Sequence, residues 1–175
     1  MDLKKYIRSI PDYPKKGILF RDITTLIKDK DAFKECIDQM SKILMKLNFD
    51  KIASIESRGF VFASALCYNL SKSLILMRKK DKLPAARYSQ EFKLEYGNAT
   101  LELHKDSVMP KEKILIIDDL IATGGTAEAG AKLVEMSNAK VAGFIFIINL
   151  FDLGGNKKLI DKSYFTKSLI EFPGH

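Results

Sequence analysis

Tryptophan is absent from this sequence of 175 residues, and cysteine and histidine occur only twice each. The two cysteines, Cys36 and Cys67, are too few for a disulfide framework, and both lie in segments that predict helices. We therefore expect neither a cysteine-based metal site nor a disulfide, and we expect a reducing, cytoplasmic setting.

Long apolar runs are also missing. The longest, residues 141–148, is far too short to cross a bilayer. The first ten residues lack the continuous apolar core of a signal peptide, and their apolar residues recur at helical spacing instead. We therefore predict a soluble protein with no membrane partner.

The chain is basic, with a net charge of +7, and is otherwise ordinary for a globular protein at 46% hydrophobic and 29% charged residues. Its length predicts one domain, residues 1–175, that buries about 70% of the surface of its unfolded chain. A basic surface serves either nucleic acid or a small substrate with several phosphate charges. Most lysines are scattered, and the one dense cluster, at residues 78–82, lacks the interleaved aromatics that stack bases. This favours a phosphate-bearing substrate and no nucleic-acid partner.

Strand and helix periodicities alternate along the chain, which predicts an α/β domain with a mostly parallel central sheet flanked by helices. The predicted helices are residues 31–48, 60–70 and 127–136, and the predicted strands are residues 52–55, 74–77, 114–117 and 140–148. The residues after 148 form a weakly patterned tail.

Residues 81–92 contain Pro84 and show no clear period, so they predict a long loop. Residues 94–104 predict a hairpin that turns at Gly97 and Asn98. Because a long loop inside a compact domain often covers an active site, we predict a flexible lid at about residues 81–97.

Residues 114–126, which read ILIIDDLIATGGT, are the most informative segment. Four apolar residues predict a strand buried on both faces, which ends at Asp118 and Asp119. A turn with two glycines and two threonines follows, and successive amides in such a turn, beside a helix N-terminus, bind anions. The plain alternative is a strand–turn–helix with solvated acids. The whole string favours a ligand that combines a phosphate with hydroxyls or a metal, as a sugar phosphate does.

This segment resembles the motif with which the type I phosphoribosyltransferase family binds 5-phosphoribosyl 1-pyrophosphate. Further segments resemble, in the same order, the adenine-specific members of that family: residues 11–24 (PDYPKKGILFRDIT), 55–60 (IESRGF), 78–84 (RKKDKLP) and 94–97 (LEYG). The resemblance implies a fold with a small hood and a flexible lid, and transfer of the phosphoribosyl group to adenine, giving AMP and pyrophosphate in purine salvage. It also implies a homodimer, with Mg²⁺ as a cofactor held mainly by substrate oxygens, so that no residue is assigned directly to the metal.

The same resemblance assigns roles to individual residues. The loop for the 5-phosphate is Ala122, Thr123, Gly124, Gly125 and Thr126. The pyrophosphate contacts are Ser57, Arg58, Arg78, Lys82 and Tyr96. The adenine contacts are Leu19, Phe20, Arg21 and Leu120, with Leu19 and Arg21 reading the base edge through main-chain groups. The catalytic set is Arg58, Asp118 and Asp119, the acids facing the ribose, and Glu95 at the tip of the lid, which assists proton movement.

Several of these residues have plainer interpretations when taken alone. Phe20 lies in an apolar run and by itself predicts core, Arg58 predicts a surface charge, and residues 79–80 predict simple solubilising charge. The chain also departs from the family pattern in the predicted lid. Residues 85–86 are Ala-Ala where relatives commonly carry Gly-Pro, and Lys93 stands where they commonly carry serine.

Two alternative functions remain at this point. The first keeps the phosphoribosyl donor but changes the base to hypoxanthine, guanine, xanthine or orotate, against which the ILFRD and LEYG segments argue. The second is a regulator that uses this fold to sense the donor while binding nucleic acid. The charge of +7 is consistent with such a regulator, but the sequence shows no helix-turn-helix segment.

Overall fold

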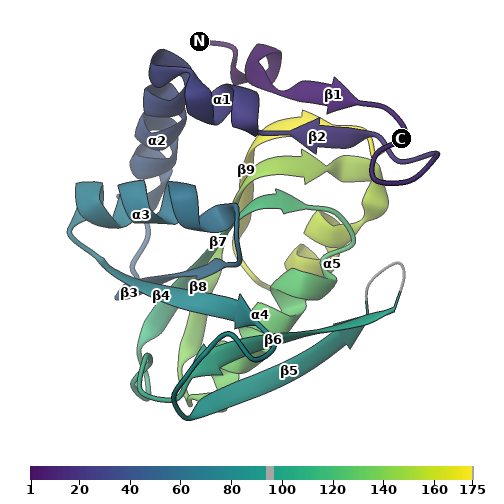
Figure 1. Ribbon diagram of the computed structural model, residues 1–175. Helices are drawn as coiled ribbons and strands as arrows, with labels where there is room; N and C mark the ends of the chain where they lie inside the picture. Colours follow the sequence, from purple (N-terminus) through teal and green to yellow (C-terminus); the bar gives the residue numbers. More distant parts are fainter. Residues whose placement is uncertain (94–96, 175) are drawn as a thin grey trace.

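The computed structural model describes residues 1–93 and 97–174. Within them, a sheet in the order β5-β6-β4-β3-β7-β8-β9 carries helices on both faces, and a separate two-stranded sheet pairs β1 with β2 (Figure 1). The strands are β1 (Arg8–Ile10), β2 (Phe20–Asp22), β3 (Lys51–Ile55), β4 (Ser73–Lys79), β5 (Arg87–Lys93), β6 (Asn98–His104), β7 (Lys113–Ile121), β8 (Lys140–Leu150) and β9 (Thr166–Phe172). The helices are η1 (Leu3–Tyr6), α1 (Thr24–Lys28), α2 (Lys30–Leu44), α3 (Gly59–Leu70), α4 (Gly125–Met136), η2 (Phe151–Leu153) and α5 (Gly155–Asp161). The predicted α/β fold with a mostly parallel sheet is confirmed, since β4, β3, β7, β8 and β9 run parallel.

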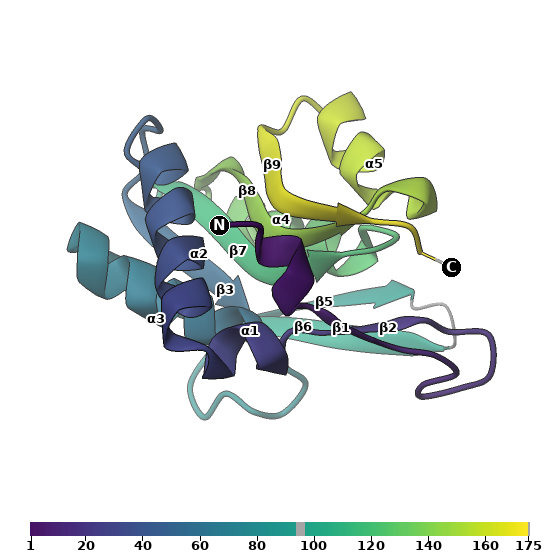
Figure 2. The same cartoon turned by 90° about the horizontal axis from the view of Figure 1, so that it is seen from above.

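The core lies on both faces of β7, because its apolar residues alternate between two clusters. Leu115 and Ile117 pack with α2 and α3, whereas Ile114 and Ile116 pack on the opposite face with α4. Figure 2 shows α2 and α3 on one side of the sheet and α5 on the other. A strand buried on both faces reads as a continuous apolar run, which is why β7 and β8 were detectable in the sequence.

The prediction of a long loop over residues 81–92 is wrong in its second half. Residues 87–93 form β5, which pairs antiparallel with β6 from Arg87 opposite His104 to Lys93 opposite Asn98. Tyr88, Gln90 and Phe92 are half-buried in alternation with exposed neighbours, but this weak pattern becomes a strand only because β6 supplies its hydrogen bonds. The predicted second arm of the hairpin corresponds to β6, but its partner strand is residues 87–93 rather than residues 94–96, which lie outside the described part of the chain.

Two other boundaries also differ from expectation. The predicted strand 114–117 continues to Ile121, so Asp118 and Asp119 lie within β7 rather than beyond its end. The tail after residue 148 is not featureless, since it contains η2, α5 and the edge strand β9. The pairing of β9 with β8 is a contact between distant segments, which local periodicity does not report.

Candidate active site

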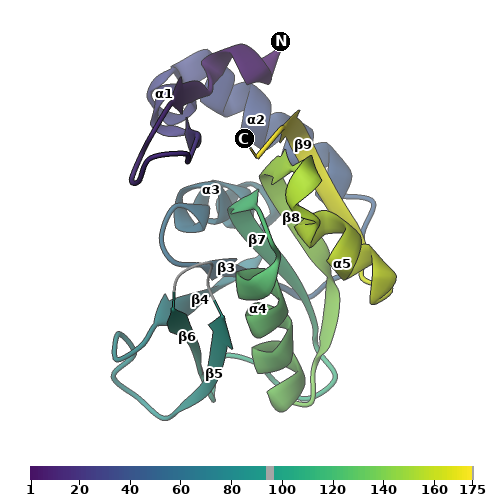
Figure 3. The ribbon, with the colours of Figure 1, turned by 90° about the vertical axis from the view of Figure 1, so that its right-hand side faces the viewer.

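A cavity of about 410 Å³ opens at the carboxyl ends of β3 and β7, where parallel sheets bind their ligands. Its floor comes from the turn after β3 and from the segment that follows the apolar part of β7, and the β5–β6 hairpin forms another wall. Figure 3 shows this hairpin beside α4. The described residues that line the cavity include Glu56, Ser57, Arg58, Lys79, Phe92, Lys93, Asp118, Asp119, Leu120, Leu153 and residues 122–126.

Residues 122–126 form a tight loop that leads into α4. Gly124 has a φ of +83°, which suits glycine, and Gly125 begins the helix. The amides at this end of α4 have no partner within the helix and carry the positive end of its dipole, so the loop suits a phosphate dianion. The structure therefore brings all five residues predicted to hold the 5-phosphate to one wall of the cavity.

Gly155 supports this loop from a distant part of the chain. Its N–H donates to the carbonyl of Ala122 at 2.9 Å. A Cβ added at Gly155 would lie 2.3 Å from that oxygen and 2.6 Å from the amide nitrogen of Gly124, so no larger residue fits. Gly155 was not among the predicted site residues, although the pair Gly154-Gly155 in the tail was a signal of a close backbone approach.

Asp118 and Asp119 line the cavity as adjacent carboxylates on β7. Burial raises the pKa of Asp118 well above its usual range, and the neighbouring Asp119 carboxylate raises it further. Burial also raises the pKa of Asp119, while the Arg58 guanidinium opposes the rise. Arg58 Nε lies 2.7 Å from Asp119 Oδ2 as an ion pair, but this oxygen accepts no hydrogen bond of good geometry within the described chain. The charged forms of Asp118 and Asp119 are therefore less stable here than in water, and both side chains face the cavity.

Asp118→Asn is expected to raise thermal stability at neutral pH. The pKa of Asp118 is higher in the folded state than in the unfolded state, so the protonated acid stabilises the folded protein. This contribution is complete below the ordinary pKa and is lost as pH rises through the folded-state pKa. A neutral amide avoids that loss, and its oxygen can still accept the 2.8 Å hydrogen bond from the Asp119 N–H. Thermal unfolding should show the variant ahead of the wild type at about pH 8 and the difference closing towards about pH 4. A variant that is less stable at the upper pH would contradict the assignment.

Gly59, the first residue of α3, allows that helix to start directly against the acidic pair. A Cβ at Gly59 would lie 2.9 Å from Asp118 Oδ1 and 2.8 Å from the hydroxyl of Ser54. Ser54 is fully buried and donates to the carbonyl of Ile117 at 3.0 Å. Gly59 lies in the segment 55–60 but was given no role from the sequence, and neither was Ser54. Together they set the position of Asp118 from the adjacent strand and helix.

The cations near the cavity differ in how freely they face it. Arg58 and Lys79 line it, whereas Arg78 is held by Glu56, whose carboxylate accepts from Arg78 Nε at 3.2 Å and from the Lys79 amide at 2.8 Å. The hydrogen bond from Arg78 is the main reason that the pKa of Glu56 is lowered. Lys82 is exposed and not part of the cavity wall, and the Glu56–Ser57 peptide is cis. The structure thus places Lys79, rather than Arg78 or Lys82, at the wall.

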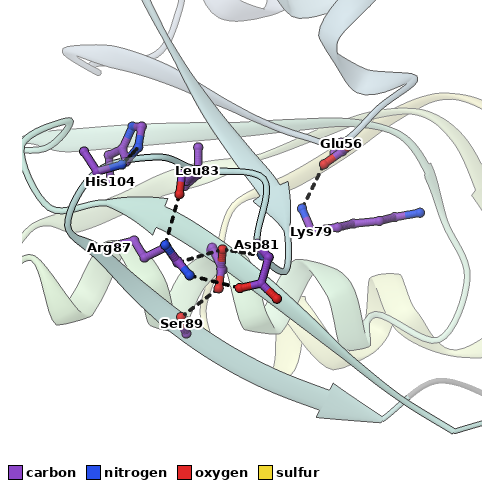
Figure 4. A network of polar contacts seen from close by, with 9 residues as sticks. Glu56, Lys79, Asp81, Leu83, Arg87, Ser89 and His104 are labelled. Atoms are coloured by element: carbon purple, nitrogen blue, oxygen red, sulfur yellow. Dashed lines mark hydrogen bonds and ion pairs between the residues drawn. The ribbon is translucent and has the colours of Figure 1, made fainter.

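A polar network fixes the loop that follows β4. Figure 4 shows Arg87 between Asp81, Leu83 and Ser89, with Glu56 and Lys79 nearby. Arg87 Nη2 pairs with Asp81 Oδ1 at 3.0 Å, and its Nε lies 3.0 Å from the buried carboxylate of Glu102. Glu102 also accepts from the amide of Asp81 at 3.0 Å. The basic cluster therefore begins on a fixed strand end rather than on a free loop.

The residues predicted to contact adenine are only partly gathered. Leu120 lines the cavity, and Phe20 lies under Arg58, with 5.4 Å from the guanidinium carbon to the ring centroid. Leu19 is half-buried in the segment that leads into β2, and Arg21 on β2 turns its side chain away from the cavity. Leu153 of η2 is an apolar wall residue that the sequence analysis did not identify. Glu95 and Tyr96 lie outside the described residues.

Comparison with known proteins agrees with this geometry. Residues 23–174 match the family model of the phosphoribosyl transferase domain. The chain therefore belongs to the type I phosphoribosyltransferase family. Within it, the chain is 67% identical to the adenine phosphoribosyltransferase of Pelagibacter ubique (strain HTCC1062), over the full length of both chains.

Solved structures give the same relationship. The adenine phosphoribosyltransferase of Thermoanaerobacter pseudethanolicus has 47% identity and a TM-score of 0.94, with 98% of each chain covered. The enzyme of Saccharomyces cerevisiae, complexed with adenine and an imino-altritol bisphosphate, has 31% identity and a TM-score of 0.89, with 97% of each chain covered. In the part of the chain that is described, no helix has the length and apolar character to cross a membrane.

Proposed function

We propose that this chain transfers the 5-phosphoribosyl group of 5-phosphoribosyl 1-pyrophosphate to adenine, giving AMP and pyrophosphate in purine salvage. The observation that carries the proposal is a single cavity in which an anion-binding loop, an acidic pair and Arg58 face one another. The adenine phosphoribosyltransferases to which the chain is similar over its whole length support the same reaction.

In this reaction the bond from the ribose C1 to pyrophosphate oxygen breaks, and a bond from C1 to a ring nitrogen of adenine forms as that nitrogen loses its proton. We assign residues 122–126 to the 5-phosphate. Asp118 and Asp119 are assigned to the ribose hydroxyls and to the positive charge that grows on the ring in an oxocarbenium-like transition state. Their partly desolvated carboxylates suit this role, because electrostatic interactions strengthen where water is excluded.

Ser57, Arg58, Arg78, Lys82 and Tyr96 remain the proposed pyrophosphate contacts, and Lys79 joins them because it lines the cavity. Arg58 suits a pyrophosphate oxygen because its planar guanidinium can donate two parallel hydrogen bonds. Leu19, Phe20, Arg21 and Leu120 remain the proposed adenine contacts. Glu95 remains the proposed group for proton movement.

We propose Mg²⁺ as the cofactor. Mg²⁺ is commonly bound by one or two carboxylates together with substrate phosphates, and Asp118 and Asp119 are the adjacent carboxylates on this cavity wall. The described residues contain no cluster of three or more histidine, cysteine or acidic side chains suited to a metal. The ion would lower the negative charge of the pyrophosphate, and substrate oxygens would supply most of its ligands.

We further propose a cytoplasmic homodimer. A cytoplasmic setting is supported by two free, buried cysteines, Cys36 and Cys67.

The dimer is supported by an apolar patch on α3, where Val61 and Tyr68, two turns apart, are 40% and 91% exposed. Tyr68→Asp should therefore shift the protein to a monomer in sedimentation equilibrium. A change of another tyrosine, such as Tyr6→Asp, would not serve as a control because Tyr6 packs on the core. Exposed Met45→Asp on the neighbouring helix end is the better control and should leave the mass unchanged. Equal masses for Tyr68→Asp and the wild type would contradict this interface.

The function is tested by supplying the phosphoribosyl donor and Mg²⁺ with each purine or pyrimidine base in turn. We expect AMP and pyrophosphate from adenine alone. Turnover with hypoxanthine, guanine, xanthine or orotate instead would change the base assignment. Donor binding without turnover of any base would overturn the enzymatic proposal.

A further inference from the structure

The side chain of Arg21 faces the C-terminal end of the chain. It is only 7% exposed, its Nη2 donates to the carbonyl of Pro173 at 3.0 Å, and its Nη1 donates to the hydroxyl of Ser9 at 2.5 Å. The guanidinium also lies 4.3 Å from the centroid of the Phe172 ring. Burial lowers the pKa of Arg21, and the charge of Asp152 opposes this effect. A buried arginine with these partners holds β2 firmly against the end of β9.

The same end of the chain touches the wall of the cavity. The amide of Gly174 donates to Asp152 Oδ1 at 2.6 Å, and a Cβ at Gly174 would lie 2.6 Å from Cγ of Leu153. Leu153 itself lines the cavity. Figure 1 shows the end of β9 close to β2, in agreement with the contact between Arg21 and Phe172. Arg21, Asp152, Pro173 and Gly174, which we call the C-terminal clamp, thus connect β2 to Leu153.

We infer that the C-terminal clamp positions adenine by setting the spacing between β2 and Leu153. The inference rests on the proposed function, in which main-chain groups near Arg21 read the base edge. A flat base needs a gap of constant width, and the hood strand β2 belongs to a sheet separate from the one that carries the phosphate loop. The clamp fixes β2 relative to Leu153, whose helix η2 directly follows strand β8 of the central sheet. The Arg21 side chain, Pro173 and Gly174 are therefore positioning residues for the base, and the site for the donor does not depend on them.

Steady-state kinetics of Arg21→Met and of a chain that ends at Phe172 test this inference. Each change removes the hydrogen bond between Arg21 and Pro173, and we expect each to raise KM for adenine by about tenfold or more, as for a lost hydrogen bond to a charged group. KM for the donor should stay within about twofold of the wild type. Because both changes delete the same contact, the combined variant should be no worse than the more affected single variant. Arg21→Lys should recover part of the adenine affinity, since it restores the charge.

Lys4→Met is the matched control. Lys4 also lies over the Phe172 ring, 4.7 Å from its centroid, but belongs to η1, and within the described residues no hydrogen bond or ion pair joins its side chain to β2 or Pro173. It should leave both KM values unchanged. Equal rises in the two KM values, additive effects in the combined variant, or the same loss in Lys4→Met would overturn the inference while adenine turnover by the wild type stands. If Arg21→Met does not fold, as judged by thermal unfolding, the shortened chain alone decides between these outcomes. A wild type that does not use adenine would overturn the proposed function and the inference together.

Discussion

Gly155→Ala is expected to lower kcat/KM for the phosphoribosyl donor by about 100-fold, the loss that follows when a reacting group is displaced by about 1 Å. The reason is steric, since the new Cβ would lie 2.3 Å from the carbonyl oxygen of Ala122 and 2.6 Å from the amide of Gly124. Both atoms are backbone atoms of the phosphate loop and cannot move away as a flexible side chain would. Initial rates at varied donor concentration, with adenine saturating, measure the effect.

Gly154→Ala separates this clash from ordinary backbone strain. Gly154 has a φ of +78°, which disfavours alanine, but no atom lies within 4 Å of its added Cβ. We expect this control to lose about 1–2 kcal/mol of stability and to keep nearly normal donor kinetics. Comparable losses of donor kcat/KM in the two variants would show that strain around the turn, and not support of the loop by Gly155, governs the site.

Asp119→Asn is expected to lower kcat by about 10²–10³-fold while the protein remains folded, the range found when one preorganised electrostatic group is removed. Asparagine has nearly the same shape, but it cannot stabilise a positive charge on the ribose or pair with Arg58, which lies 2.7 Å from Asp119 Oδ2. Burial raises the pKa of Asp119, so removal of its charge should not lower thermal stability. Rates at saturating substrates and thermal unfolding should be measured together.

Asp50→Asn provides the control, because Asp50 precedes β3 and contacts the end of β7 opposite to Asp119. Asp50 Oδ2 accepts from the amide of Lys113 at 2.7 Å at the start of β7, and an amide oxygen can replace it there. We expect normal kcat for this variant. An Asp119→Asn enzyme with normal kcat, or one whose loss of activity follows a loss of folded protein, would contradict the role proposed for Asp119.

The sequence was most informative where the physical signal is local. The buried strands β7 and β8 are continuous apolar runs because helices cover both faces of the sheet, and the Gly-Gly turn before α4 has a composition that few other structures require. These two features suffice to predict the α/β class and the phosphate loop. Arg58 and Asp119 were predicted separately, but their 2.7 Å contact depends on β3 and β7 being adjacent in the sheet.

Contacts between distant segments decided the rest. Strand β5 exists because β6 pairs with it, Gly155 approaches Ala122 from over thirty positions away, and Arg21 reaches Pro173 across the whole domain. Burial likewise raises the pKa values of Asp118 and Asp119, an effect that their place in the sequence did not predict. Periodicity and turn composition record only the preferences of neighbouring residues. The sequence by itself therefore determined the family, the central strands and the anion-binding turn, whereas packing in three dimensions decided which backbone atoms hold that turn and what desolvation does to the acids beside it.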